Sequence, residues 1–191
     1  MPNYCYYQMR VVGKKENVEE FVKIMQADYN YQSMKFDYEK HIGGRVFEAS
    51  VDEFEEVANG IYGANISGDC AWSVLSCMFD GPYCYYNDIK EKYGAECRST
   101  TVPIESERLN LSIEIYSEES GMCFQEHYLV KNGVVEIADC VDWYEYCVDE
   151  YETKEEAEKE LEMEITEEEW ETGQQECCFR RGGFDDWSFE I

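Results

Sequence analysis

The chain has 191 residues and a formal net charge of -27, from 43 acidic and 16 basic side chains. Such a charge disfavours direct binding to nucleic acid or to an anionic membrane surface, because both are polyanions. Aromatic residues make up 15% of the chain, which is more than a disordered acidic protein carries and enough to build a core. The sequence lacks an apolar run long enough to span a membrane, so we expect a soluble protein in the cytoplasm of a host cell.

The N-terminal residues predict a strand followed by a helix. Tyr4–Val12 alternates between apolar and polar positions up to Gly13, as a half-buried strand does. The next apolar residues repeat at the spacing of one helical face, at Val18, Phe21, Val22 and Met25. Asn17 and Glu20 have the spacing of a capping pair at the start of this helix.

Weaker patterns follow up to residue 100. We predict a loop over Tyr29–Gly44, a short strand over Arg45–Ala49, and a helical stripe in Val51–Asn59 formed by Phe54, Val57 and Ala58. A strand over Ala64–Trp72 then leads into a short helix that Ser73 caps and that ends at Phe79. A further helical turn is predicted in Asn87–Tyr93, ended by Gly94.

The clearest strand signal is the alternation from Leu109 to Ile115. Two more apolar runs, Phe124–Val130 and Val134–Ala138, flank Asn132-Gly133. Asn-Gly between two such runs predicts a two-residue hairpin, because both central residues must adopt positive φ.

The chain changes character near Cys140. Asp139–Glu176 holds 17 acidic residues and only two basic ones, Lys154 and Lys159. Trp143–Val148 is strand-like, and Thr153 with Glu156 predicts a capping box at the start of a helix that extends to Glu162. Thr166 with Glu169 predicts a second helix, which contains Trp170, and the tail Trp187–Ile191 is predicted as an edge strand.

Three stretches of residues 1–138 resemble the YubB-type proteins of phages and conjugative plasmids. These are Met1-Pro2-Asn3-Tyr4-Cys5 running into Val11-Val12-Gly13, then Ala71-Trp72-Ser73, then Leu111–Tyr116 followed by Glu118-Glu119-Ser120-Gly121-Met122. Tyr4 and Ser120 stand where that family has Trp and Pro, and its Pro pair after Ala-Trp-Ser is missing. The resemblance implies a ferredoxin-like βαββαβ core and a mobile-element origin, and it implies no reaction.

Together these patterns predict an α+β protein. A ferredoxin-like core would span residues 1–138, and an acidic, partly helical extension, residues 139–191, would pack on it.

Candidate residues for catalysis are His41 and His127, either of which could pair with one of the ten cysteines. With so many thiols some lie near a histidine by chance, and the common nucleophile, phosphate-loop and dinucleotide motifs are missing.

Several cysteines are spaced seven residues apart (Cys70, Cys77, Cys84; Cys140, Cys147). None form a C-x-x-C pair, so we expect thiols packed in the core. Asp185-Asp186 or Asp139 with Asp142 are weak candidates for a metal site. We expect no enzyme, no metal and no cofactor.

The remaining hypothesis is mimicry of nucleic acid. Duplex DNA carries one negative charge per roughly 1.7 Å of its axis, and a helix of glutamates rises about 1.5 Å per residue. Glu155, Glu158 and Glu162 would form one ladder, and Glu156, Glu160 and Glu164 another. Aromatic anchors would come from Trp143, Tyr144, Tyr146 and Trp170.

We therefore expect a mobile-element anti-defence inhibitor, of the anti-CRISPR or anti-restriction type, that binds the basic nucleic-acid channel of its target. The predicted contact residues are Glu155, Glu156, Glu158, Glu160, Glu162, Glu167, Glu168, Glu169 and Trp170. One alternative is a non-enzymatic acidic interaction or structural module of a phage or plasmid, whose charge serves solubility. A third is a small enzyme that uses a cysteine with His127.

Overall fold

The computed structural model describes residues 3–27, 29–30, 35–43, 45–80, 90–91 and 99–191. The chain divides into two compact units. Unit 1 comprises Met1–Cys140 together with Asp186–Ile191, and unit 2 comprises Val141–Asp185. The last six residues thus belong to the same unit as the N-terminal strand.

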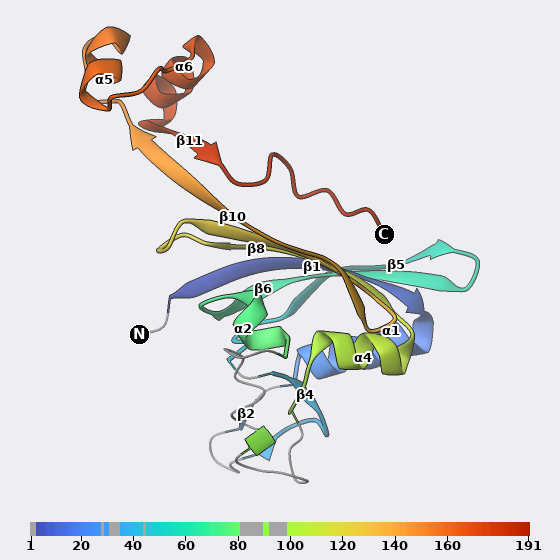
Figure 1. Ribbon diagram of the computed structural model, residues 1–191. Coiled ribbons are helices and arrows are strands. Elements are labelled where there is room, and N and C mark those ends of the chain that lie inside the picture. The colour runs from blue at the N-terminus through green and yellow to red at the C-terminus, as the bar shows by residue number, and fades with distance from the viewer. Residues whose placement is uncertain (1–2, 28, 31–34, 44, 81–89, 92–98) are drawn as a thin grey trace. The chain divides into compact units, whose positions relative to one another are not determined.

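Unit 1 is built on an antiparallel sheet. Its strands are β1 (Tyr4–Lys14), β5 (Ser50–Ala58), β6 (Ile61–Ala71), β8 (Ser112–Glu119), β9 (Phe124–Lys131) and the first part of β10 (Val134–Cys147), in the spatial order β10-β9-β8-β1-β6-β5 (Figure 1). β1 pairs along most of its length with both β6 and β8, so it is a central strand. The predicted strands at residues 4–12 and 64–72 are confirmed.

The predicted ferredoxin-like βαββαβ core is wrong as a description of this fold. The described residues form one large antiparallel sheet of seven strands, counting β11 (Cys178–Gly182), with 44% strand and 26% helix. The added width comes from β9 and β10, which follow β8 directly as a meander. Asn132 and Gly133, at φ 48° and 83°, return the chain into the sheet in two residues, so the predicted hairpin is confirmed.

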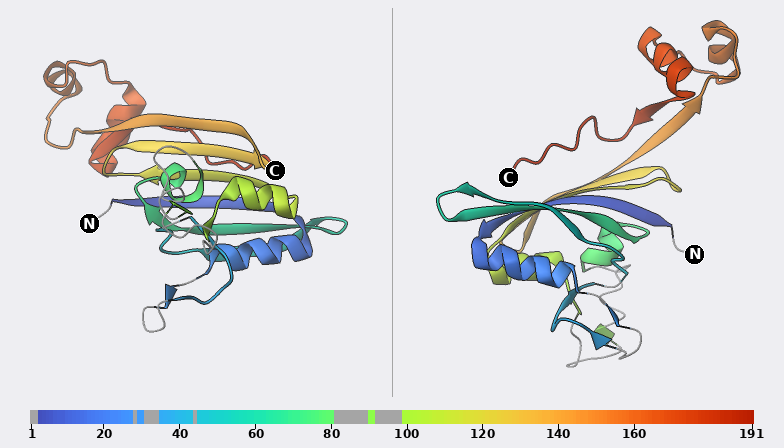
Figure 2. Two further views of the ribbon diagram at one scale, coloured as in Figure 1. Left: turned by 60° about the horizontal axis from the view of Figure 1, so that its bottom comes forward. Right: turned by 180° about the vertical axis from the view of Figure 1, so that it is seen from behind.

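Three helices cover one face of the sheet in unit 1: α1 (Lys15–Met25), α2 (Val74–Met78) and α4 (Val102–Leu109) (Figure 2). The β1 side chains on this face, at Cys5, Tyr7, Met9 and Val11, are fully buried. α1 faces them with Val18, Phe21, Ile24 and Met25. Each such side chain contributes about 1.5–3 kcal/mol through burial, which makes this layer the main core of the chain.

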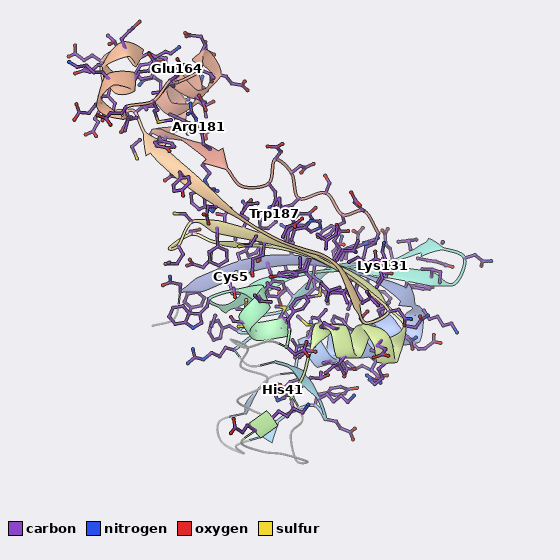
Figure 3. The ribbon with its side chains drawn as sticks, viewed as in Figure 1. Cys5, His41, Lys131, Glu164, Arg181 and Trp187 are labelled. Atoms are coloured by element: carbon purple, nitrogen blue, oxygen red, sulfur yellow. The ribbon has the colours of Figure 1, made fainter. Side chains whose placement is uncertain are left out.

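The other face of the sheet carries polar and aromatic residues and is partly covered by the C-terminal tail (Figure 3). The Trp187 ring stacks nearly parallel to those of Tyr6 and Tyr116, with centroids 6.2 and 5.9 Å away. The Glu190 amide donates to Glu114 Oε2 at 2.7 Å. The predicted edge strand over residues 187–191 is therefore wrong, because ring stacking and this bond hold the tail without a ladder.

Two predictions in the middle of the chain are wrong. Most of the segment Val51–Asn59, predicted as helical, lies in β5, which ends at Ala58. β5 is an edge strand whose side chains are almost all exposed, so burial imposed no strand pattern on the sequence. Arg45–Ala49 forms no strand and makes only an isolated bridge from Val46 to Cys70.

The boundary at Leu109 also differs from the prediction. Leu109 ends α4 and does not begin a strand, since Asn110 takes a left-handed conformation (φ 51°) and β8 starts at Ser112. α4 itself, with Pro103 in its first turn, was not predicted.

The predicted capping pair of the first helix is wrong. The N-cap of α1 is Lys14, and Asn17 donates from Nδ2 to the Leu109 carbonyl at 2.7 Å. Glu20 pairs with Arg108 at 2.6 Å. Both side chains therefore join α1 to α4. The cap predicted at Ser73 is confirmed, because its hydroxyl accepts from the Ser76 amide.

Two short ladders complete unit 1. β2 (Tyr29–Asn30) pairs with β3 (Lys35–Phe36), and β4 (His41–Ile42) runs parallel to β7 (Ser99–Thr100). The predicted helical turn at Asn87–Tyr93 lies outside the described residues except for Lys90 and Glu91, and Gly94, Cys84 and Cys97 also lie outside them. Among the helices described, none combines the length and apolarity needed to cross a membrane.

Candidate functional site

Unit 2 carries every predicted contact residue. The second half of β10 pairs with β11, and α5 (Lys154–Glu160) and α6 (Glu167–Glu176) lie between these strands in the chain. Its small core consists of Val148, Ala157, Ile165 and Phe179. A Cβ on Gly173 would approach Val148 Cγ2 to 2.2 Å, so α6 packs too closely for a side chain there.

Threonine caps begin both helices, as predicted. Thr153 Oγ1 accepts from the Glu156 amide, and Thr166 Oγ1 accepts from the Glu169 amide. Only the second is a complete capping box, because Glu169 Oε2 accepts in return from the Thr166 amide at 2.7 Å. Glu156 instead accepts from the Glu152 amide.

The predicted glutamate ladders do not extend as far as expected. α5 ends at Glu160, Leu161 is its C-cap, and Glu162 takes a positive φ of 54°. Glu162 and Glu164 therefore leave the helical register of Glu155–Glu160. The prediction of a helix through Glu162 is wrong by two residues, because the apolar Leu161 turns toward the small core and the chain must turn with it.

Besides Glu156, three of the predicted glutamates have hydrogen-bond or ion-pair partners within unit 2. Glu158 Oε1 accepts from the Ile165 amide at 2.9 Å, and Glu167 pairs with Lys154 at 2.7 Å. Glu169 pairs with Arg181 at 2.6 Å, and this ion pair with the capping bond lowers the pKa of Glu169 to about 2. Figure 3 labels Arg181 beside Glu164, whose backbone carbonyl also accepts from Arg181. These carboxylates have structural partners.

Glu155, Glu160, Glu162 and Glu168 are exposed and have no such partner among the described residues, and Glu156 and Glu167 are exposed as well. Glu155 and Glu156 lie in the first turn of α5, and Glu168 lies in the first turn of α6. Negative charge there also stabilises each helix through its dipole, by roughly 0.3–1 kcal/mol per residue. The sequence patterns that predicted a binding surface thus also predicted helix ends.

Trp170 is half-buried against the small core. It therefore offers little exposed surface for the anchoring role predicted for it. Among the other predicted anchors Trp143 is buried, Tyr146 packs against the core, and only Tyr144 is largely exposed, at 57%. Tyr144 is the aromatic side chain in unit 2 best placed to contact a partner.

The charge of unit 2 is strongly unbalanced. Its residues include 17 acids and four bases. Lys154 and Arg181 pair with glutamates, and Arg180 lies over the Trp143 ring and 3.7 Å from Glu145. Hydrogen bonding to Glu167 raises the pKa of Lys154, which keeps that ion pair charged. Most of the basic side chains of unit 2 are therefore paired within the unit, and its net electrostatic potential is negative.

The third sequence-based hypothesis is an enzyme that pairs a cysteine with His127, which lies in β9. His127 Nε2 lies 2.9 Å from Glu114 Oε1, and its ring stacks on Tyr116 on the face opposite the helices. Cys5 and Cys70 oppose each other across β1 and β6 on the helix-covered face. Hydrogen bonds with Cys5 and Cys77, with burial, raise the pKa of Cys70, which disfavours a thiolate.

His41, the other candidate, is buried beside β7, and burial lowers its pKa. Within the described residues, His, Cys, Asp and Glu form no group of three or more with metal-binding geometry.

Several buried acids went unpredicted. Glu105, Glu114 and Glu126 are nearly or fully buried in unit 1. Glu126 accepts from the Val74 amide, Ser117 and Tyr128, and its pKa is raised by burial. Glu105 is held by Lys40 and Arg108. Glu114 and Glu126 lie in strands and Glu105 lies in α4. Lys40 and Val74, which bind Glu105 and Glu126, are too far away in sequence for these contacts to be predicted from it.

No family model, curated protein or solved structure matches this chain. The resemblance to YubB-type proteins stays a prediction.

Proposed function

We propose that this chain is a stoichiometric inhibitor that places the acidic surface of unit 2 in the basic nucleic-acid channel of a target enzyme. The observation that carries the proposal is the unbalanced charge of unit 2, with 17 acids against four bases in Val141–Asp185. A surface of this kind attracts cationic grooves and repels nucleic acid. Together with the resemblance to mobile-element proteins, it favours an anti-defence role in the host cytoplasm, against a CRISPR effector or a restriction nuclease.

The set of residues assigned to contact with the target is smaller than the set that the sequence predicted. Exposed Glu155, Glu160, Glu162 and Glu168 can act as phosphate surrogates, since the described structure gives their carboxylates no hydrogen bond or ion pair. Glu158 and Glu169 instead shape the surface through their bonds to Ile165 and Arg181. Tyr144 replaces Trp170 as the proposed aromatic contact.

The mechanism needs no turnover. Long-range attraction brings the acidic surface to the channel, and short-range pairing with the target's lysines and arginines displaces the nucleic acid. Because these pairs form at an exposed surface, each contributes modestly, and affinity comes from their number.

One observation favours the alternative of an acidic interaction module. The predicted set includes five first-turn glutamates of α5 and α6, where acids stabilise a helix whatever the surface does. If this were their whole role, reversing the exposed charges would cost helix stability and leave partner binding unchanged.

A charge-reversal experiment distinguishes the inhibitor from the acidic interaction module. Glu155, Glu160, Glu162 and Glu168 are changed together to Lys, and a control variant reverses Glu39, Asp52, Glu91 and Glu107, which are exposed acids of unit 1. Both variants carry the same net charge. An RNA-guided effector and several restriction endonucleases are assayed for cleavage with each protein at low and at moderate salt. We expect the wild type and the control to inhibit at least one enzyme and the unit 2 variant to lose at least about tenfold in potency. Equal losses in both variants, or no inhibition of any enzyme by the wild type, would refute the proposal.

A further inference from the structure

A second exposed surface lies on unit 1, at the end of the sheet where β1 begins. Four large apolar side chains gather there: Tyr4 (62% exposed), Phe47 (47%), Trp72 (44%) and Met122 (68%). We call these four residues the aromatic patch. Large exposed apolar side chains grouped at one place are unusual on a protein surface and mark interaction sites.

Asn3 brings the patch together. The Trp72 amide donates to the Asn3 carbonyl at 3.0 Å, and Gly121, the neighbour of Met122, lies against the Asn3 side chain. Tyr4 follows Asn3 directly, and its ring lies 5.3 Å from that of Phe47. Four parts of the chain that are distant in sequence therefore meet at this end of the sheet, and each carries one exposed apolar side chain.

The backbone holds two of these side chains outward. Trp72 takes a φ of 71°, a left-handed conformation that a bulky residue seldom adopts, between the end of β6 and the N-cap of α2. Met122 lies in a turn whose amides, at Gly121 and Met122, donate to the buried Glu119 carboxylate. Backbone strain of this kind persists where the surrounding structure imposes it, and it concentrates at functional sites.

Acidic groups border the patch. The Phe47 amide donates to the Asp69 carbonyl at 2.8 Å, and Glu48 follows Phe47. The Glu48 amide also donates to the Asp69 carbonyl, at 3.3 Å, and burial together with the Glu48 charge raises the pKa of Asp69. Arg45, which is also exposed, is the nearest base in sequence to Phe47. Aromatic faces beside carboxylates are the environment that a guanidinium prefers, since it stacks on a ring and pairs with an acid at once.

We infer that the aromatic patch binds a protein surface that presents arginine among apolar side chains. A second copy of the chain is a poor occupant, because each copy carries a net charge of -27. An ammonium group is also a poorer fit, because it is more strongly hydrated and lacks a planar face. The inference goes beyond the proposed function: it concerns unit 1 and holds whether or not unit 2 is a mimic.

Two blocked hexapeptides provide the probe, one alternating arginine with leucine and the other alternating lysine with leucine. Residue-resolved NMR on the full chain reports the Tyr4 and Trp72 amides, the Trp72 indole and the Met122 methyl group. At the patch we expect saturable shifts, with the arginine peptide binding about threefold to tenfold more tightly than the lysine peptide. Amides of the acidic helices α5 and α6 serve as the internal comparison and should respond to both peptides alike.

Two variants sharpen the experiment. Trp72→Gly removes a ring where glycine fits the backbone, and Met122→Ser shortens the most exposed member; both should abolish the arginine preference at the patch. Val134→Ser, at an equally exposed apolar residue (62%) of the hairpin, is the matched control and should keep it. The unit 2 charge reversal should also keep it, which separates this inference from the mimicry proposal.

The inference is overturned if the patch signals do not shift, or if they shift equally with the two peptides. It is also overturned if sedimentation of the peptide-free protein shows a concentration-dependent dimer that Met122→Ser disrupts. Unchanged amide spectra elsewhere in unit 1 establish that each variant is folded.

Discussion

Different interactions stabilise unit 1 and unit 2. The described part of unit 1 contains an extended hydrophobic core of 24 buried residues, built by β1, β6 and β8 against α1, α2 and α4. Unit 2 has a core of four, and its helices depend on two threonine caps and on the pairs Glu167–Lys154 and Glu169–Arg181. A unit with so little apolar burial must draw more of its stability from charge, so acidity in unit 2 has a structural role as well as the proposed functional one.

The largest effect should come from the core of unit 1. Phe21→Ala removes a fully buried ring between α1 and the sheet, and the lost burial with the resulting cavity should cost about 3–5 kcal/mol of unfolding free energy. Phe47→Ala, at a half-exposed ring, should change it by less than about 0.5 kcal/mol. Urea denaturation measures both. A small loss for Phe21→Ala would mean that the core is not where unit 1 gains its stability.

The next effect should be confined to unit 2. Phe179 is buried, stacks on Tyr146 at 5.4 Å and lies next to Gly173, so Phe179→Ala should destabilise this unit by about 3 kcal/mol. Hydrogen exchange should then accelerate in α5 and α6, while the amides of β1 and β8 stay protected. Equal acceleration in both units would show that they unfold together and would contradict their separate stabilisation.

The capping box gives a smaller change. Thr166→Ala removes the hydroxyl that accepts from the Glu169 amide, and it should cost about 1 kcal/mol. Thr153→Ala should cost less, because Glu156 does not complete the reciprocal bond there. Thr172→Ala, inside α6, is the control for loss of a threonine. Hydrogen exchange of the first-turn amides measures the stability lost in each of the three variants. Identical losses of stability in Thr166→Ala and Thr172→Ala would rule out capping.

Several features of the fold and the site followed from local sequence alone. Alternation predicted β1, Asn132-Gly133 predicted the β9–β10 turn, and the spacing of Thr166 and Glu169 predicted the start of α6. In each case the signal and its physical cause lie within a few residues of each other.

Other features depend on partners far away in the chain. β5 is exposed along its length, so only its pairing with β6 makes it a strand. Buried Glu105 needs Lys40, 65 residues earlier, and the roles of Glu158 and Glu169 depend on Ile165 and Arg181. The sequence predicted where the negative charge lies, but it could not predict which carboxylates are already paired.

The smallest expected effect is the change in stability of unit 2 with pH. The pKa of Glu169 is lowered from 4.5 to about 2, so the carboxylate is more acidic in the folded state. Its pair with Arg181 therefore stabilises unit 2 above pH 4.5, and this contribution is lost as pH falls toward 2. Because the pair is partly exposed, it should contribute about 0.5–1 kcal/mol. Arg181→Gln should remove it, together with much of the acid sensitivity of α6 below pH 4.5. Acid titration of both proteins by circular dichroism measures the difference, and parallel curves would contradict it.

The most direct test of the central claim is the salt dependence of binding to an inhibited nuclease. Affinity is measured between about 50 and 200 mM salt for the wild type, the unit 2 reversal and the equally charged unit 1 control. If unit 2 fills a channel built for phosphates, affinity should fall steeply with salt for the wild type and for the control, and the unit 2 reversal should bind weakly with a much shallower slope. If the two reversed variants show the same slope, binding reflects net charge alone, and the assignment of the interface to unit 2 is contradicted.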